Sequence, residues 1–315
     1  ALVTPKALGA GMLAVARAGS RLVAVGERGI VLLSDDAGQH WRQAQVPVQA
    51  TLTAVRFVDA RTGWAVGHLG VVLRSDDGGA TWHRQLDGVA AAALVLDEAK
   101  AAGDEAAIAR AQRFVDEGPD KPFFDIACTD AQHAWVVGAY GLILTTEDGG
   151  RTWRSLQTRL ANKLGVHLYA VQAQAGALWV AGEQGLLARS DDGGAHFSAL
   201  ASPYKGSFFG LLETRDGALL AYGLRGNVFR SSDGGAQWQK VESGLPVSIG
   251  AGLALDDGRV VLLAQNGDLL VSRDGGATLA RVPAPRPLPA AGLASAGDGQ
   301  LLLASLRGLQ RVPLP

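Results

Sequence analysis

Six aspartates recur along the chain, and each occupies the same position in a short motif. The motif reads Ser/Thr-x-Asp-x-Gly-x-x followed by a large apolar residue, and its aspartates are Asp36, Asp77, Asp148, Asp192, Asp233 and Asp274. Carboxylates could serve as acid–base groups or metal ligands, but both uses require several acids at one place. Each aspartate can instead accept hydrogen bonds from the N–H groups of its own turn. We therefore expect the motif to stabilise turns, with no catalytic role and no bound metal.

A large apolar side chain ends each copy of the motif. Four copies have a tryptophan and the other two have Phe197 and Leu279; the tryptophans are Trp41, Trp82, Trp153 and Trp238. Truncating a buried tryptophan typically costs about 3–5 kcal/mol of stability. We expect these side chains to pack between neighbouring sheets and to contribute more to stability than any single turn hydrogen bond.

The motif is the last part of a longer repeat. Three of the five intervals between successive aspartates are 41 residues long, one is 44 and one is 71. Within residues 49–87, an inner strand, a second strand, a tight turn with Gly70, a third strand and a short outer strand follow one another. A repeat of this period indicates one supersecondary unit per copy, stacked against its neighbours. The sequence therefore predicts an all-β chain that folds as one domain over residues 1–315.

The residues around the motif resemble a known family. Residues 63–70 read Gly-Trp-Ala-Val-Gly-x-x-Gly, residues 75–82 read Ser-x-Asp-Gly-Gly-x-Thr-Trp, and residues 134–153 contain a near copy of both. This repeat is identified as an Asp-box, or bacterial neuraminidase repeat, and its extended form resembles that of the photosystem II stability/assembly factors. The resemblance implies a seven-bladed β-propeller. Its blades would lie near 9–48, 49–87, 123–160, 165–203, 206–244, 248–284 and 288–315.

The two ends of the chain each lack part of a blade. Residues 288–315 contain three strand patterns and no Asp box, whereas residues 1–4 lie in the register of an outer strand without a blade of their own. We expect residues 1–5 to supply the fourth strand of the last blade. Such a strand would close the ring and remove an exposed sheet edge.

Residues 88–118 interrupt the repeat between blades 2 and 3. Residues 89–102 are rich in strong helix formers, Gly103 interrupts them, and Asp104 is a favourable N-cap for a second helix. Apolar residues then recur at helical spacing from Ala107 to Val115. We expect a helical hairpin that either covers propeller surface or forms a docking element for a partner.

The turns between the second and third strands should share one face with the connections between blades. They supply our candidate partner-binding residues: Arg28, His68, Tyr140, Glu183, Arg225, Asn266 and Arg307. Arginine offers paired donors to carboxylate or carbonyl oxygens, and tyrosine is a common interface anchor. Alternatively, these residues are solvated turn tips. Arg28 and Arg307 belong to adjacent blades, whereas Arg225 lies further around the ring.

A glycan-binding or sialidase-like propeller is the alternative function. Sialidase chemistry requires an arginine cluster, a tyrosine nucleophile with a glutamate partner, and an acid–base aspartate, and the four tyrosines show no such pattern. The six histidines lack metal-ligand spacing, and no glycine-rich loop precedes a helix to bind phosphate. The net charge of −1 gives no electrostatic reason for nucleic-acid binding. We expect neither an enzyme nor a cofactor.

The resemblance implies an accessory or assembly factor that binds an integral membrane protein or membrane complex. Phototroph members of the family help to assemble the photosystem II reaction centre, and related bacterial propellers are associated with resistance-nodulation-division exporters. The insertion departs from the phototroph pattern and favours another membrane partner. The resemblance also implies a periplasmic or otherwise extracytoplasmic location after signal-peptide removal, with which the N-terminal Ala1 is compatible. Without a run of 18 apolar residues, we expect no membrane span.

Overall fold

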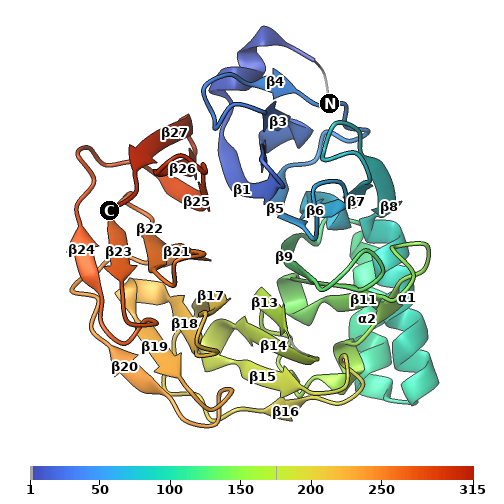
Figure 1. Cartoon of the computed structure of the whole chain (residues 1–315). Coiled ribbons are helices and arrows are strands. Elements are labelled where there is room, and N and C mark those ends of the chain that lie inside the picture. Colours follow the sequence, from blue (N-terminus) through green and yellow to red (C-terminus); the bar gives the residue numbers. More distant parts are fainter. Residues whose placement is uncertain (1–2, 175) are drawn as a thin grey trace.

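The computed structural model describes residues 3–174 and 176–315. Seven small antiparallel sheets follow one another around a common centre in chain order (Figure 1). The first strand of each sheet lies nearest the centre, and the later strands lie progressively further out. This arrangement confirms the predicted seven-bladed β-propeller.

Six of the sheets have four strands each, and we number them as blades 1–6. The strands of blades 1–3 are β1 (Met12–Ala18), β2 (Arg21–Gly26), β3 (Val31–Ser34) and β4 (Arg42–Gln43); β5 (Leu52–Phe57), β6 (Gly63–Gly67), β7 (Val72–Ser75) and β8 (His83–Leu86); and β9 (Phe123–Cys128), β10 (Ala134–Gly138), β11 (Ile143–Thr146) and β12 (Arg154–Ser155).

The second half of the ring repeats this plan. Its strands are β13 (Leu168–Gln174), β14 (Ala177–Gly182), β15 (Leu187–Ser190) and β16 (Ser198–Ala199); β17 (Phe208–Glu213), β18 (Leu219–Gly223), β19 (Val228–Ser231) and β20 (Gln239–Val241); β21 (Ile249–Ala254), β22 (Val260–Ala264), β23 (Leu269–Ser272) and β24 (Ala280–Val282); and, in blade 7, β25 (Ala290–Ser295), β26 (Gln300–Ser305) and β27 (Gly308–Pro313). Blade 7 is therefore a three-stranded sheet within the described residues.

The predicted closing strand is wrong for residues 3–5; residues 1 and 2 lie outside the described part of the chain. Pro5–Gly9 is a short 3-10 helix, η1, whose first turn is capped by the Thr4 hydroxyl accepting from the Lys6 N–H. Proline has no N–H for a sheet ladder and suits the first position of a helix. The helix instead places Ala7 in the apolar cluster between blades 1 and 7, beside residues such as Leu302.

Each pair of neighbouring blades encloses its own apolar cluster. The cluster between blades 1 and 2 joins Val23 and Leu33 of the first blade to Leu73 and Trp82 of the second. Trp82 is only 3% exposed, and its indole N–H donates to the carbonyl of Gly79 at 2.9 Å. Trp41, Trp153 and Trp238 likewise lie with residues of the blade before their own. The motif tryptophans thus act as wedges between blades.

Side-chain hydrogen bonds also join each of the first five blades to the next. A side-chain N–H donates to the carbonyl of the residue that follows the motif aspartate in the next blade. These bonds are Arg21 to Gly78 (3.2 Å), Arg74 to Gly149 (2.8 Å), Trp135 to Gly193 (3.0 Å), Trp179 to Gly234 (2.9 Å) and Arg230 to Gly275 (2.8 Å). The Asp-box turns are therefore part of the contact between blades.

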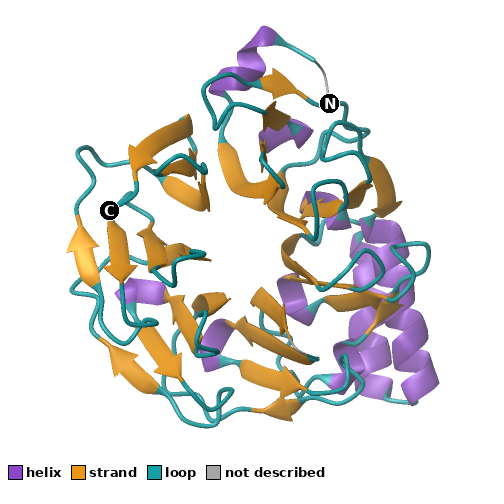
Figure 2. Cartoon of the chain, viewed as in Figure 1, coloured by secondary structure: helices purple, strands orange, loops and turns teal. Residues whose placement is uncertain are grey.

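The insertion forms two antiparallel helices, α1 (Gly88–Ala102) and α2 (Glu105–Glu117), which pack outside the ring of strands (Figure 2). Asp87 and Asp104 cap them by accepting from backbone N–H groups three residues on. Gly103 joins the helices with φ 69°, a left-handed conformation that glycine tolerates. Among the described residues, no helix is both long and apolar enough to cross a membrane.

The insertion leaves blade 2 and returns to blade 3 at almost one point. A Cβ atom built on Gly88 would lie 2.6 Å from the Pro119 carbonyl oxygen and 2.8 Å from its Cα. The buried side of α1, which includes Val95 and Ala99, belongs to the same apolar cluster as Trp153 of blade 3. The hairpin is thus an appendage that is added to the propeller without altering the order of its blades.

Candidate partner-binding site

The seven turns between second and third strands are held by one repeated hydrogen bond. The N–H that opens each turn donates to the carbonyl of the residue just before the inner strand of the same blade. The pairs are Glu27 with Gly11, His68 with Thr51, Ala139 with Pro122, Glu183 with His167, Leu224 with Ser207, Gln265 with Ser248, and Leu306 with Pro289. These bonds place the turns and the connections between blades on one face of the propeller, which we call the turn face.

The candidate residues of the turn face differ in their availability. Arg28, His68, Arg225 and Arg307 are exposed, and Tyr140 is 48% exposed. The turns of Arg28 and Arg307 are neighbours, since Glu27 and Leu306 both lie within 3.7 Å of a Cβ built on Gly11. Asn266 is half-buried and its side-chain amide bonds Asp268 in its own turn. Glu183 is half-buried too, and its carboxylate accepts two hydrogen bonds from neighbouring residues.

Tyr140 and Glu183 come together through two residues that the sequence did not single out. The Tyr140 N–H donates to Nδ1 of His167 at 2.8 Å, and the two rings meet edge to face at 4.9 Å between centroids. Glu183 accepts from the His167 N–H at 2.9 Å and from the Tyr169 hydroxyl at 3.1 Å. The turns of blades 3 and 4 therefore form one connected polar and aromatic cluster.

The Tyr169–Glu183 pair has the composition of a sialidase nucleophile and its base, but its environment opposes that chemistry. Burial, together with the charge and the hydrogen bond of the nearby Glu183 carboxylate, raises the pKa of Tyr169 to about 12. A nucleophilic tyrosine needs a proton that is easily lost. In the described part of the chain, no arginine hydrogen-bonds or pairs with either side chain. The pair therefore serves to position the turn.

Two further aromatic residues extend this cluster from Tyr169 along successive inner strands. Phe124, Tyr169 and Phe209 each occupy the second position of β9, β13 and β17, and their ring centroids are 5.2 and 5.3 Å apart. Aromatic pairs at such distances gain stability beyond their buried area. An alignment of the repeats by their inner strands would have revealed this series, because it places the three rings at one position. The same position in blade 2 is Thr53, which is not aromatic.

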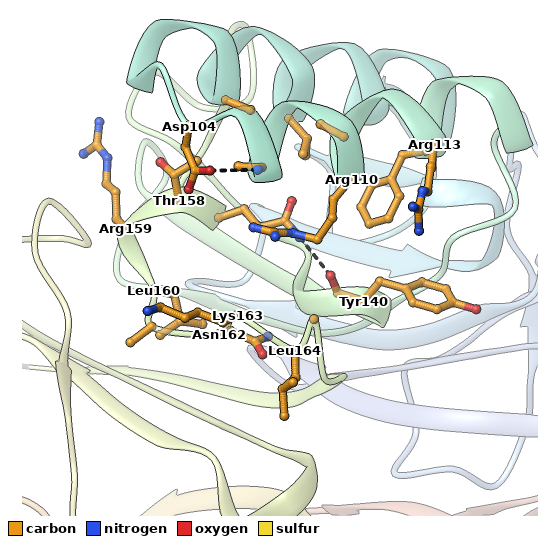
Figure 3. A pocket seen from close by; sticks show the side chains of 18 of the residues that line it. Asp104, Arg110, Arg113, Tyr140, Thr158, Arg159, Leu160, Asn162, Lys163 and Leu164 are labelled. Atoms are coloured by element: carbon orange, nitrogen blue, oxygen red, sulfur yellow. Dashed lines mark hydrogen bonds between the residues drawn. The ribbon is translucent and has the colours of Figure 1, made fainter.

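A pocket of about 500 Å³ lies beside Tyr140, between the insertion and a loop at residues 157–165 (Figure 3). Apolar groups of α1, α2 and the loop line it, among them Val95, Ala107 and Leu160. Four basic residues also line it: Arg110 and Arg113 from α2, and Arg159 and Lys163 from the loop. No repeat predicts this pocket, because both of its walls depart from the repeat.

The insertion itself holds the loop in place. The Glu98 carboxylate of α1 accepts from the N–H groups of Gln157 and Thr158 at 3.0 and 3.2 Å, and from the Thr158 hydroxyl at 2.6 Å. On the other side, the Gln157 amide donates to the Tyr140 carbonyl at 2.8 Å. The pocket is therefore fixed both to the insertion and to the turn face.

The Asp boxes form closed hydrogen-bonded turns away from this site. In the second box the Ser75 hydroxyl donates to Asp77 and accepts from the Gly79 N–H, both at 2.8 Å, and Asp77 accepts from the Thr81 N–H at 2.9 Å. The other five boxes repeat this pattern. Among residues 3–174 and 176–315, no three His, Cys, Asp or Glu side chains gather as metal ligands.

These bonds predict a loss of stability in acid. The N–H and hydroxyl of Thr152 lower the pKa of Asp148 to about 2, and the hydroxyls of Ser272 and Thr278 lower that of Asp274 to about 2. Because the folded-state pKa lies below the unfolded value of about 4, the stabilisation is complete above pH 4. We expect the urea midpoint to fall as the pH drops from about 4 to about 2.

A substitution in one Asp box separates its contribution to this pH dependence from the contributions of the other acids. The variant Asp148→Asn keeps an acceptor oxygen but cannot take up the proton, so its urea midpoint should fall less steeply over this range than that of the wild type. A wild-type midpoint that stays constant between these pH values would contradict the structural role of the boxes.

Comparisons with known proteins agree with this geometry. A family profile described as "Photosynthesis system II assembly factor YCF48" matches residues 33–115 and 109–239. No curated protein sequence matches the chain. A solved structure of YCF48 bound to D1 peptide has a TM-score of 0.71 at 17% identity, over 100% of this chain and 96% of the other.

Two further solved structures share the fold. YCF48 from Cyanidioschyzon merolae has a TM-score of 0.70 at 16% identity, covering 98% of this chain and 97% of the other. Virginiamycin B lyase from Staphylococcus aureus has a TM-score of 0.74 at 12% identity, covering 98% and 96%. At such identities these likenesses establish the propeller fold alone, and one fold supports both binding proteins and enzymes.

Proposed function

The chain belongs to the photosystem II assembly factor YCF48 family, and on this premise we propose that it is a non-catalytic propeller that binds an integral membrane protein. In this role it acts as an assembly or accessory factor for a membrane-protein complex. The observation that carries the proposal is the family match, joined to a rigid turn face with exposed recognition residues. The repeated turn hydrogen bonds hold that face in one shape, so binding costs little conformational entropy.

A related structure supports the kind of partner. YCF48 has been solved with a bound D1 peptide, so a propeller of this architecture can take up a peptide. In the present chain, Tyr140 and the exposed Arg28, Arg225 and Arg307 offer an aromatic anchor and guanidinium donors for such a segment. We propose that the partner contacts the turn face, with the insertion beside the contact.

We further propose an extracytoplasmic location and a partner other than photosystem II. The helical insertion favours a partner other than photosystem II, because it adds a surface that the repeated blades do not supply. A resistance-nodulation-division exporter is our proposed client. A glycan-binding or sialidase-like propeller is the alternative, and the raised pKa of Tyr169 speaks against sialidase-like chemistry.

Site-specific photocrosslinking in native membranes tests the proposed function. A photoreactive residue replaces Leu164 or Leu69, which are 80% and 48% exposed and lie beside or on the turn face. The matched control places it at the exposed Arg273, in an Asp-box turn. We expect adducts with one integral membrane protein from the first two positions and none from the third. Equal labelling from all three, or no membrane-protein adduct at all, would refute the proposal.

A further inference from the structure

The pocket between the insertion and the 157–165 loop, which we call the insertion pocket, is lined by acidic and basic side chains that differ in whether they have partners. Its two lining acids already have partners: Asp104 caps α2 through the Ala107 N–H, and Glu117 pairs with Lys121 at 2.9 Å. The nearby Glu98 is occupied by the loop residues that it holds. Within the described residues, none of these carboxylates forms an ion pair with a basic residue that lines the pocket.

The four basic residues that line the pocket differ from these acids, because they have no such partners among the described residues. Arg110, Arg113, Arg159 and Lys163 are exposed, and in the described chain none of their side chains forms a hydrogen bond or an ion pair. Figure 3 shows Arg110 and Arg113 coming from α2, with Arg159 and Lys163 on the loop across the pocket. These four cations outnumber the two acids that line the pocket, Asp104 and Glu117, so the pocket favours an acidic ligand.

Apolar surface lies between these charges. The side chains of Ala107, Ala111 and Phe114 form the buried stripe of α2 that lines the pocket. At the rim, Leu164 is 80% exposed and Tyr140 is 48% exposed. Apolar residues that line one pocket and are rimmed by charged groups are typical of a surface that a partner covers. A ligand for this pocket therefore carries an apolar side chain as well as negative charge.

We propose that this pocket binds an acidic peptide segment of the partner, with an aliphatic or aromatic side chain seated between α2 and the 157–165 loop. The inference rests on the proposed function and names the chemistry of the segment recognised. The cations pair with its Asp, Glu or terminal carboxylates, and arginine does so with two parallel hydrogen bonds. Tyr140 connects the pocket to the turn face, so one partner can occupy both.

Fluorescence anisotropy with synthetic peptides tests the proposal. The probes are a labelled glutamate-rich peptide with two leucines, its counterpart with lysine for glutamate, and its counterpart with serine for leucine. We expect the full chain to bind the first peptide best, and binding to weaken as salt is raised. The double variant Arg110→Glu/Arg113→Glu should weaken it by about tenfold or more.

Two controls make the result decisive. The double variant Lys240→Glu/Arg273→Glu changes the net charge equally at exposed positions of other blades, outside the connections between blades, and should bind like the wild type. Equal weakening by both double variants, or equal binding of the lysine peptide, would overturn the proposal. So would binding to phosphatidylglycerol vesicles that depends on Arg110 and Arg113 while the acidic peptide does not bind. If photocrosslinking still finds a membrane partner, only the pocket assignment fails.

Discussion

Replacing Trp82 with alanine should lower the free energy of unfolding by about 3–5 kcal/mol. The side chain is 3% exposed and lies between blades 1 and 2, where it meets Phe57 edge to face at 6.0 Å. Its loss leaves a cavity at a contact between blades and leaves the Gly79 carbonyl without its indole partner. Urea denaturation followed by circular dichroism measures the change.

Two matched variants show which part of the tryptophan matters. Trp82→Phe keeps most of the apolar volume and loses the hydrogen bond, so its destabilisation should be about 1–3 kcal/mol. Trp41 makes the equivalent bond to Gly38 at 3.1 Å but is only half-buried, and Trp41→Ala should cost less than Trp82→Ala. If Trp82→Ala and Trp41→Ala cost the same small amount, the wedges do not hold the blades together.

The repeat explains why the ring could be predicted so closely. Each Asp box ends a unit with the same small and large residues in the same order, and each unit has an apolar face that only its neighbour can cover. The helical insertion was predictable as well, since its strong helix formers and the N-cap Asp104 are local signals. Local patterns that repeat thus determine most of the fold.

The features that the sequence did not predict have a common physical cause. They depend on contacts between residues that share no sequence pattern. Counting along the repeat predicts a strand for residues 3–5, but Pro5 and the capping Thr4 favour a helical turn. The His167–Tyr140 bond joins two connections in adjacent blades. The insertion pocket depends on Glu98 reaching a loop about 60 residues away in sequence, a contact that no periodicity encodes.

Removing the insertion should weaken capture of the partner by about tenfold or more while the propeller remains folded. Because Gly88 and Pro119 already touch, deletion of residues 89–118 can join them directly without moving the blades. The deletion removes Arg110, Arg113 and one wall of the pocket, and it also releases the loop held by Glu98. Stability should fall, because α1 covers apolar residues of blade 3 such as Trp153.

Affinity capture from solubilised membranes tests most directly whether this propeller binds a membrane protein beside its insertion. Tagged wild type, the 89–118 deletion and the Arg273→Glu control are incubated with the same extract, and bound proteins are quantified by mass spectrometry. Circular dichroism first establishes that all three are folded. We expect wild type and control to enrich one integral membrane protein equally, and the deletion to lose about tenfold or more of it. A folded deletion variant that captures the same protein as well as the wild type would contradict this account.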